Sequence, residues 1–144
     1  MKFLFCLLTL AISLPSFANA APWHTDYKRA LAQAKAEQKP VLMYFTGSDF
    51  CGYCKQLDRQ ALDQKPFHDY ADRNLVLLKL DFPARKPQSR WEREQNETLR
   101  MRYRVSGFPT LILLNPRGSV AGEVNARSLR PLLHEIERMT KNRR

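Results

Sequence analysis

Cysteine and histidine are both scarce in this chain of 144 residues, which contains three of each. A structural zinc site takes four ligands, and the histidines at positions 24, 68 and 134 show no paired ligand spacing. We therefore expect no metal site. A site built from two cysteines and two histidines is the remote alternative.

Long apolar runs are also missing, apart from one near the N-terminus. That run covers residues 3–14, whereas a transmembrane helix takes about 20 apolar residues. Lys2 before the run and small residues at positions 18 and 20 after it are typical of a signal peptide, cleaved after residue 20 or after residue 18. We therefore predict a signal peptide at residues 1–20 and a soluble, exported domain at residues 21–144. An uncleaved membrane anchor is the alternative.

Acidic residues are outnumbered by basic ones, 14 to 24, so the formal net charge is +10. Outside the cytoplasm, a basic chain of this kind does not indicate a nucleic-acid partner. The charge favours acidic protein partners or anionic envelope lipids, or it is no more than a solvated basic surface.

The scarcity of cysteine draws attention to the pair that remains after export. Cys6 lies inside the predicted signal peptide, so the mature chain keeps only Cys51 and Cys54. A disulfide that closes so short a loop stabilises a fold little, although exported proteins occupy compartments where disulfides persist. We therefore interpret the pair as present for its chemistry. It follows an apolar run at residues 41–45 and opens a stretch with a helical pattern.

The hydrophobic pattern predicts helices that alternate with strands. We expect helices at residues 24–38, 52–62, 90–103 and from residue 129 onward, a short helical turn at 66–70, and strands at 41–46, 75–81, 110–114 and 119–124. The element order α-β-α-β-α-β-β-α implies one parallel pair of strands and a terminal antiparallel hairpin. The predicted fold is therefore an α/β domain with a mixed sheet of about four strands, flanked by helices.

Two motifs, on matching elements and in matching order, resemble the thioredoxin superfamily. Cys51-Gly52-Tyr53-Cys54 stands where the first strand meets its helix, and Gly107-Phe108-Pro109-Thr110 stands before the third strand. The resemblance covers nearly all of the mature chain and is nearest to small exported thioredoxin-like proteins. It implies that Pro109 is cis, lies against the cysteine pair and exposes the backbone of Phe108 to a substrate peptide. An ordinary trans proline at the start of a strand is the alternative.

The position of the two cysteines predicts different roles for them. Cys51 would begin a helix, where unpaired N–H groups and the macrodipole favour a thiolate. A free cysteine, with a pKa near 8.5, is only about 3% ionised at pH 7, and a pKa of about 7 would ionise half of it. We predict that Cys51 is the nucleophile and that Cys54, one turn further on, resolves the mixed disulfide. Gly52 would let a substrate chain approach, and Tyr53 would line the rim.

The chain departs from the superfamily in the strand that precedes the cysteines. Thioredoxins bury an acidic residue there, beneath the second cysteine, whereas the candidate positions here are Tyr44 and Phe45. Lys79 could occupy the matching lysine position in the next strand. Asp49 is the nearest acid in the sequence, although a solvated loop aspartate is the stronger interpretation of it. The group that accepts the Cys54 proton is therefore left open.

The predicted function is that of an exported thiol–disulfide oxidoreductase, located in a periplasm and acting on cysteines of envelope proteins. We expect a reductase kept reduced by a membrane electron donor, with no organic cofactor and no nucleic-acid partner. The Gly-Tyr dipeptide is similar to that of periplasmic disulfide isomerases, so an oxidant or isomerase is an alternative. A binding or chaperone-like module with an inert disulfide is another.

Overall fold

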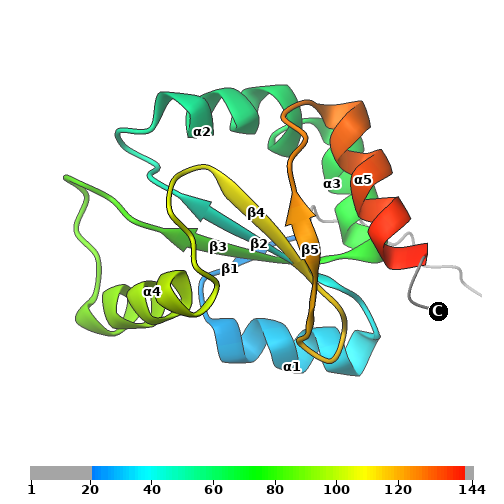
Figure 1. Cartoon of the computed structure of the whole chain (residues 1–144), viewed down its shortest axis with the longest axis horizontal. Helices are drawn as coiled ribbons and strands as arrows, with labels where there is room; N and C mark the ends of the chain where they lie inside the picture. The colour runs from blue at the N-terminus through cyan, green and yellow to red at the C-terminus, as the bar shows by residue number, and fades with distance from the viewer. Residues whose placement is uncertain (1–20, 142–144) are drawn as a thin grey trace, which may run out of the picture.

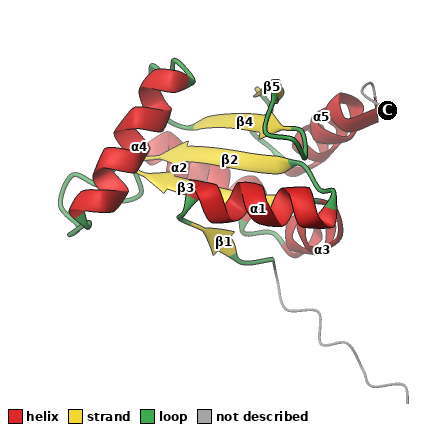
Figure 2. Cartoon of the chain, turned by 90° about the horizontal axis from the view of Figure 1, so that it is seen from below, coloured by secondary structure: helices red, strands yellow, loops and turns green. Residues whose placement is uncertain are grey.

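A five-stranded mixed sheet separates two layers of helices in the computed structural model, which describes residues 21–141 (Figures 1 and 2). The strands are β1 (Trp23–His24), β2 (Val41–Thr46), β3 (Val76–Asp81), β4 (Thr110–Leu114) and β5 (Val120–Val124). The helices are α1 (Tyr27–Glu37), α2 (Gly52–Leu57), its π-helical continuation η1 (Asp58–Leu62), α3 (Lys65–Asn74), α4 (Arg90–Arg102) and α5 (Leu129–Lys141). The predicted signal peptide at residues 1–20 lies outside the described residues.

The strand order is β1-β3-β2-β4-β5, and β2 lies at the centre of the sheet. Its pairing with β3 is parallel, and its pairing with β4 is antiparallel, as is that of β4 with β5. Every residue of β2 is buried because helices cover both faces of the sheet. Leu42 and Tyr44 face the layer of α2, α3 and α5, whereas Met43 and Phe45 belong to the other core cluster, on the side of α1.

The predicted α/β architecture with a mixed sheet is confirmed, with one strand more than the expected four. The additional strand is β1, in which Trp23 and His24 pair in parallel with Leu77 and Leu78. A strand of two residues is too short to show an alternating pattern, so no periodicity indicated it. The same pairing corrects the predicted start of the first helix from His24 to Tyr27.

The short helical turn expected at residues 66–70 is a helix of ten residues, α3. Phe67 and Ala71 are fully buried, one helical turn apart, so the helix has an apolar contact with the sheet beyond residue 70. The Phe67 ring stacks on Trp23, with ring centroids 6.4 Å apart. This contact joins α3 to the edge strand that the sequence did not predict.

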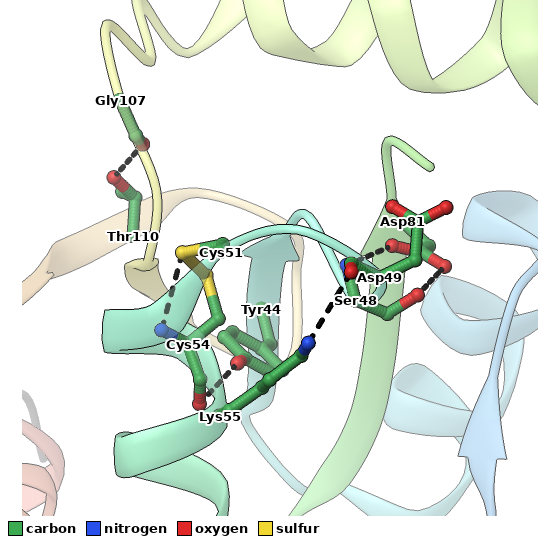
Figure 3. Close-up of a disulfide and its surroundings, with 9 residues drawn as sticks. All are labelled: Tyr44, Ser48, Asp49, Cys51, Cys54, Lys55, Asp81, Gly107 and Thr110. Atoms are coloured by element: carbon green, nitrogen blue, oxygen red, sulfur yellow. Dashed lines mark hydrogen bonds between the residues drawn. A yellow bond between two sulfur atoms is a disulfide. The ribbon is translucent and has the colours of Figure 1, made fainter. Parts of the chain in front are cut away.

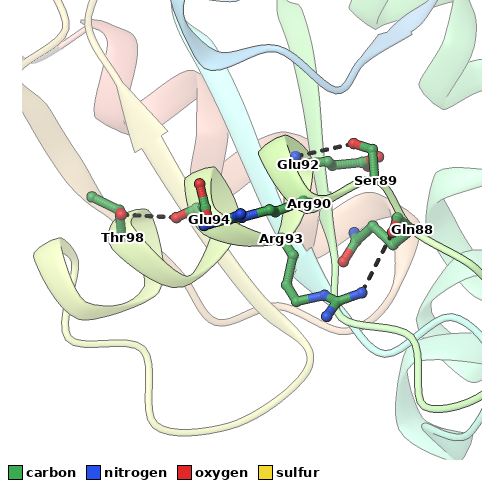
Figure 4. A network of polar contacts seen from close by, with 7 residues as sticks. All are labelled: Gln88, Ser89, Arg90, Glu92, Arg93, Glu94 and Thr98. Atoms are coloured by element: carbon green, nitrogen blue, oxygen red, sulfur yellow. Dashed lines mark hydrogen bonds and ion pairs between the residues drawn. The ribbon is translucent and has the colours of Figure 1, made fainter.

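Helix α4 begins at the predicted cap residue. The Ser89 hydroxyl accepts a hydrogen bond from the backbone N–H of Glu92 (3.1 Å), and Arg90 forms an ion pair with Glu94 one turn further on (Figure 4). Both members of the ion pair are largely exposed, so we assign the stabilisation of this helix start to the cap.

Replacement of Ser89 with alanine is expected to lower the free energy of unfolding by about 1 kcal/mol, because one N–H at the helix start loses its partner. Urea denaturation would measure the change. The matched control is Ser119→Ala, at an exposed turn position, which is expected to alter stability by less than about 0.5 kcal/mol. Equal effects of the two substitutions would contradict the assignment of the cap.

Candidate active site

Cys51 and Cys54 form a disulfide at the start of α2, with their Cα atoms 5.2 Å apart (Figure 3). Cys51 is the N-cap of this helix, and its Sγ accepts the backbone N–H of Cys54 at 3.1 Å. The N–H of Cys51 in turn donates to the carbonyl oxygen of Gly47 (2.9 Å). The fold therefore directs a hydrogen-bond donor at the sulfur that would carry negative charge after reduction.

The two cysteine residues differ in their exposure to solvent. Cys51 is 9% exposed, whereas Cys54 is completely buried. The side chains next to Cys51 are open, since Phe50 is 53% and Tyr53 77% exposed. A β-carbon added at Gly52 would have no atom within 4 Å, so the backbone there is free of side-chain cover. Of the two cysteines, Cys51 is therefore the more exposed, and the attacking role of Cys51 and the resolving role of Cys54 stay predictions.

The peptide bond between Phe108 and Pro109 is cis, which confirms the prediction. The ring of Phe108 stacks on Phe82, with centroids 4.9 Å apart, and packs against the buried cluster that contains both cysteines. The Thr110 hydroxyl donates to the carbonyl oxygen of Gly107 (2.8 Å). Figure 3 shows that the turn containing these two residues lies near the disulfide. The pairing of a substrate with the Phe108 backbone stays a prediction.

Of the two candidate positions in the strand before the cysteines, Tyr44 is the one that lies beneath Cys54. The side chain is 1% exposed, and its hydroxyl donates to the carbonyl oxygen of Cys54 at 3.3 Å (Figure 3). Lys79 is its partner in the β2–β3 register, and the Lys79 Nζ lies 5.9 Å from the centroid of the Tyr44 ring. Burial raises the pKa of Tyr44 above its usual value of 10.0, so the phenol stays protonated.

Asp58 is the residue of this site that the sequence interpretation missed. It lies four residues after Cys54, so both side chains share one face of the helix, and its backbone N–H donates to the carbonyl oxygen of Cys54. Burial raises the pKa of Asp58 above its usual value of 3.8, and the neighbouring Tyr44 hydroxyl and Lys79 cation oppose that rise. The spacing of four residues from Cys54 was the available signal.

Asp49 is an exposed loop aspartate, as expected, and backbone N–H groups of another loop bind its carboxylate. It accepts the backbone N–H groups of Ala84 (2.9 Å), Arg85 (2.7 Å) and Lys86 (3.0 Å). These hydrogen bonds, that of Ala84 foremost, lower the pKa of Asp49 to about 2. A carboxylate with so low a pKa is a weak base, so Asp49 is unsuited to take the Cys54 proton.

Two further findings concern the described residues, 21–141. No three side chains of histidine, cysteine, aspartate or glutamate are grouped there as a metal ion would require. No helix in this range combines the length and the apolar character needed to cross a membrane.

The structure combines a mixed sheet, a Cys-X-X-Cys disulfide at a helix start and a cis-proline before the third long strand. Together these features define the thioredoxin-fold class. Within that class, the chain belongs to the thioredoxin-like domain family, whose model matches residues 27–137. The family expected from the sequence is thus confirmed.

Two curated relatives and one solved structure agree with this assignment. The disulfide bond reductase DsbH of Chlamydia pneumoniae is 34% identical over 104 residues, which cover 72% of this chain and 62% of that protein. The thiol:disulfide interchange protein DsbD 2 of Pseudomonas aeruginosa is 36% identical over 107 residues, 70% of this chain and 17% of that one. A solved structure of a DsbH oxidoreductase superposes with a TM-score of 0.80 at 28% identity, covering 94% of this chain and 95% of that one.

The chain therefore spans less than two thirds of the length of these two curated relatives. Their names place them among Dsb-type proteins, and this agrees with the class expected from the sequence, a thioredoxin-like thiol–disulfide oxidoreductase.

Proposed function

We propose that this chain is an exported thiol–disulfide oxidoreductase that exchanges disulfides with cysteines of envelope proteins. The observation that carries the proposal is the pairing of a reachable Cys51 with a buried Cys54 at a helix start. In the reducing direction, the Cys51 thiolate attacks a substrate disulfide, forms a mixed disulfide and releases one substrate thiolate. The Cys54 thiolate then attacks Cys51 Sγ, which releases the second substrate thiolate and leaves the disulfide seen here.

The substrate contacts that we propose surround Cys51. Gly52 provides an uncovered backbone and Tyr53 an exposed ring. Phe108, which is partly buried, and the cis Pro109 fix the opposite wall, where the backbone of Phe108 pairs with the substrate chain. None of these steps requires an organic cofactor.

Cys54 has to lose its proton before it can attack, and we assign Asp58 as the acceptor. The Tyr44 phenol has a raised pKa and cannot take a proton near neutral pH. Asp58 lies one helical turn from Cys54, beside the Tyr44 hydroxyl, and burial makes it a stronger base than an ordinary aspartate. In this assignment the Tyr44 hydroxyl orients the Asp58 carboxylate, and the Lys79 cation offsets its negative charge.

Asp58→Asn is expected to slow the release of the mixed disulfide on the order of 10²-fold at pH 7, because the general base is lost. Rapid quench of a Cys51 mixed disulfide at several pH values would measure the rate. The matched control is Asp63→Asn, which removes the same charge from an exposed position just after η1. Equal slowing by both substitutions would show that charge, and not Asp58, sets the rate.

Asp58 also predicts a pH dependence of stability. Since its folded-state pKa is raised, the folded chain binds a proton more tightly than the unfolded chain, and stability falls as pH rises above 3.8 through the folded pKa. The Asp58→Asn variant is expected to lack this decline in urea denaturation.

We propose that the protein acts as a reductase, and that a membrane electron donor returns Cys51 and Cys54 to the dithiol form. The name of the DsbH relative, a disulfide bond reductase, supports this direction. Titration of the Cys51–Cys54 pair against glutathione would test it. A potential near about −270 mV, as in thioredoxin, supports a reductase, whereas one near about −120 mV, as in DsbA, indicates an oxidant.

The activity itself is tested by insulin reduction in the presence of dithiothreitol, which the chain is expected to accelerate. No acceleration by the correctly folded protein would favour the alternative, a binding or chaperone-like module with an inert disulfide. A Cys54→Ser trap in an envelope extract would then identify protein substrates as mixed disulfides with Cys51.

The periplasmic location rests on the sequence of residues 1–20, as does the domain assignment of residues 21–144. Fractionation of bacteria that express the full chain would test the location, and recovery in the cytoplasm would contradict it. The mass of the mature protein would show whether cleavage follows residue 18 or residue 20.

A further inference from the structure

A basic loop is fastened to the segment that leads into Cys51. We call residues 83–88, Pro-Ala-Arg-Lys-Pro-Gln, the basic loop. The Asp49 carboxylate accepts the backbone N–H groups of three consecutive residues of this loop, at 2.7 to 3.0 Å. Asp49 is two residues from Cys51, so the attachment holds the basic loop against the segment that carries Cys51.

Three cationic residues belong to this attachment or contact it. The Lys86 Nζ donates to the Ser48 hydroxyl (3.2 Å), and the Lys55 Nζ donates to the carbonyl oxygen of Asp49 (3.2 Å). Arg85 stands between Ala84 and Lys86 on the exposed basic loop. Within residues 21–141, no carboxylate forms an ion pair with Lys55, Arg85 or Lys86.

The two nearby carboxylates are engaged by neutral donors. Asp49 binds the three backbone N–H groups, and Asp81 accepts both the N–H (2.9 Å) and the hydroxyl (2.6 Å) of Ser48. Both acids therefore organise the loops and do not pair with the cations. The positive charge of the basic loop and of Lys55 is left available to a partner.

Two exposed aromatic residues belong to the same chain segment as Asp49 and Lys55. Phe50 and Tyr53 flank Cys51 in the chain and are 53% and 77% exposed. The Phe50 ring lies over Gly47, where an added β-carbon would come within 2.5 Å of it, so the position of this ring is defined. Cations without an acidic partner, together with exposed aromatic rings in the same segment, suit a peptide that presents both acidic and apolar side chains.

We propose that Lys55, Arg85 and Lys86, with Phe50 and Tyr53, form a docking surface that selects extended protein segments with acidic residues flanking the reacting cysteine. The inference rests on the proposed function, since it names the substrate class of the same site. The occupant is a protein segment because the surface borders Cys51, whose reaction partner is a cysteine sulfur. Asp49 is a positioning residue, which acts by holding the basic loop in place.

The test compares disulfide-bonded peptides that are identical except for two residues flanking the cysteine, which are glutamate, glutamine or lysine. The wild-type protein is expected to reduce the glutamate peptide with a kcat/KM roughly tenfold higher than the glutamine peptide at low ionic strength. The ratio is expected to shrink as salt is added, because exposed charges are screened. A wild-type ratio near one would overturn the inference.

The double variant Arg85→Gln/Lys86→Gln is expected to bring the ratio of the glutamate to the glutamine peptide close to one. Its matched control is Arg117→Gln/Arg138→Gln, which removes two exposed charges from the β4–β5 turn and from the later part of α5 (Figure 1). The control has the same net charge and is expected to keep the wild-type ratio. An equal loss in the control would overturn the inference, because overall charge would then account for the preference.

Asp49→Ala, which removes the attachment of the basic loop, is expected to lower the ratio mainly through a higher KM for the glutamate peptide. Asp49→Asn keeps one acceptor oxygen for the loop N–H groups and is expected to restore part of the ratio. A ratio that neither variant alters would overturn the positioning role.

Failure of the docking surface is distinguishable from failure of the proposed oxidoreductase function. If the wild-type protein reduces none of the three peptides, the oxidoreductase function is overturned, and the docking surface with it. Binding to phosphatidylglycerol vesicles that requires Arg85 and Lys86, together with an unchanged peptide ratio in the double variant, would assign the surface to lipid and overturn the inference.

Discussion

Replacement of Cys51 with serine is expected to reduce insulin turnover to the uncatalysed background. A serine hydroxyl cannot form a mixed disulfide, and the remaining thiol of the pair, Cys54, is completely buried. Cys54→Ser is also expected to stop turnover, but at a later step, because Cys51 can still attack and then has no partner to release it. The precipitation of insulin measures the first effect, and non-reducing electrophoresis with mass spectrometry measures the trapped adduct.

The two serine variants control for one another. Each removes the same disulfide and leaves one thiol of the pair, and the short loop makes the loss of stability small in both. Any difference in adduct formation therefore reports which sulfur attacks. Adducts formed by Cys51→Ser and not by Cys54→Ser would show that the two roles are reversed.

Replacement of Tyr44 with alanine is expected to lower the free energy of unfolding by about 3–5 kcal/mol, as for other large aromatic side chains removed from a core. The Tyr44 ring is buried beneath Cys54 and packs on Trp23, with centroids 5.9 Å apart. Tyr44→Phe keeps the ring and removes one hydrogen bond to Cys54, so about 0.5–1.5 kcal/mol is expected. Urea denaturation of the oxidised proteins would measure both values.

The matched control for this prediction is Tyr53→Ala, at a tyrosine that is 77% exposed. It is expected to change stability by less than about 0.5 kcal/mol, since a surface ring loses little burial. A loss for Tyr44→Phe as large as that for Tyr44→Ala would mean that the hydroxyl, and not the ring, supports the core under the disulfide.

The sequence was sufficient for the parts of the fold that have strong local patterns. The apolar runs of β2 and β3 mark strands covered on both faces, and Ser89 marks the start of α4. The two-residue strand β1 and the full length of α3 were not predicted, because both depend on contacts between residues far apart in the sequence. Trp23 belongs to a strand only through its pairing with Leu77, and α3 is held by the burial of Phe67 and Ala71.

The residues of the candidate site likewise divide into those that the local sequence indicates and those that only tertiary contacts reveal. Cys51 and Cys54 are recognisable because they are close in the chain and occupy a junction of strand and helix. Asp58 was detectable from its spacing to Cys54, but its raised pKa depends on how deeply the helix buries it. The role of Asp49 could not be predicted from the sequence, since its hydrogen-bond partners lie 35 to 37 residues away on another loop.

By itself the sequence determined the chemistry of this protein: a Cys-X-X-Cys pair, its place at a helix start, and a proline before the third long strand. Only the tertiary structure decided what surrounds that chemistry. It placed Tyr44, Asp58 and Lys79 together beneath Cys54 and bound the basic loop to Asp49. The physical reason is that periodicity and propensity act over a few residues, whereas these contacts depend on the β2–β3 register and on the packing of α2 against the sheet.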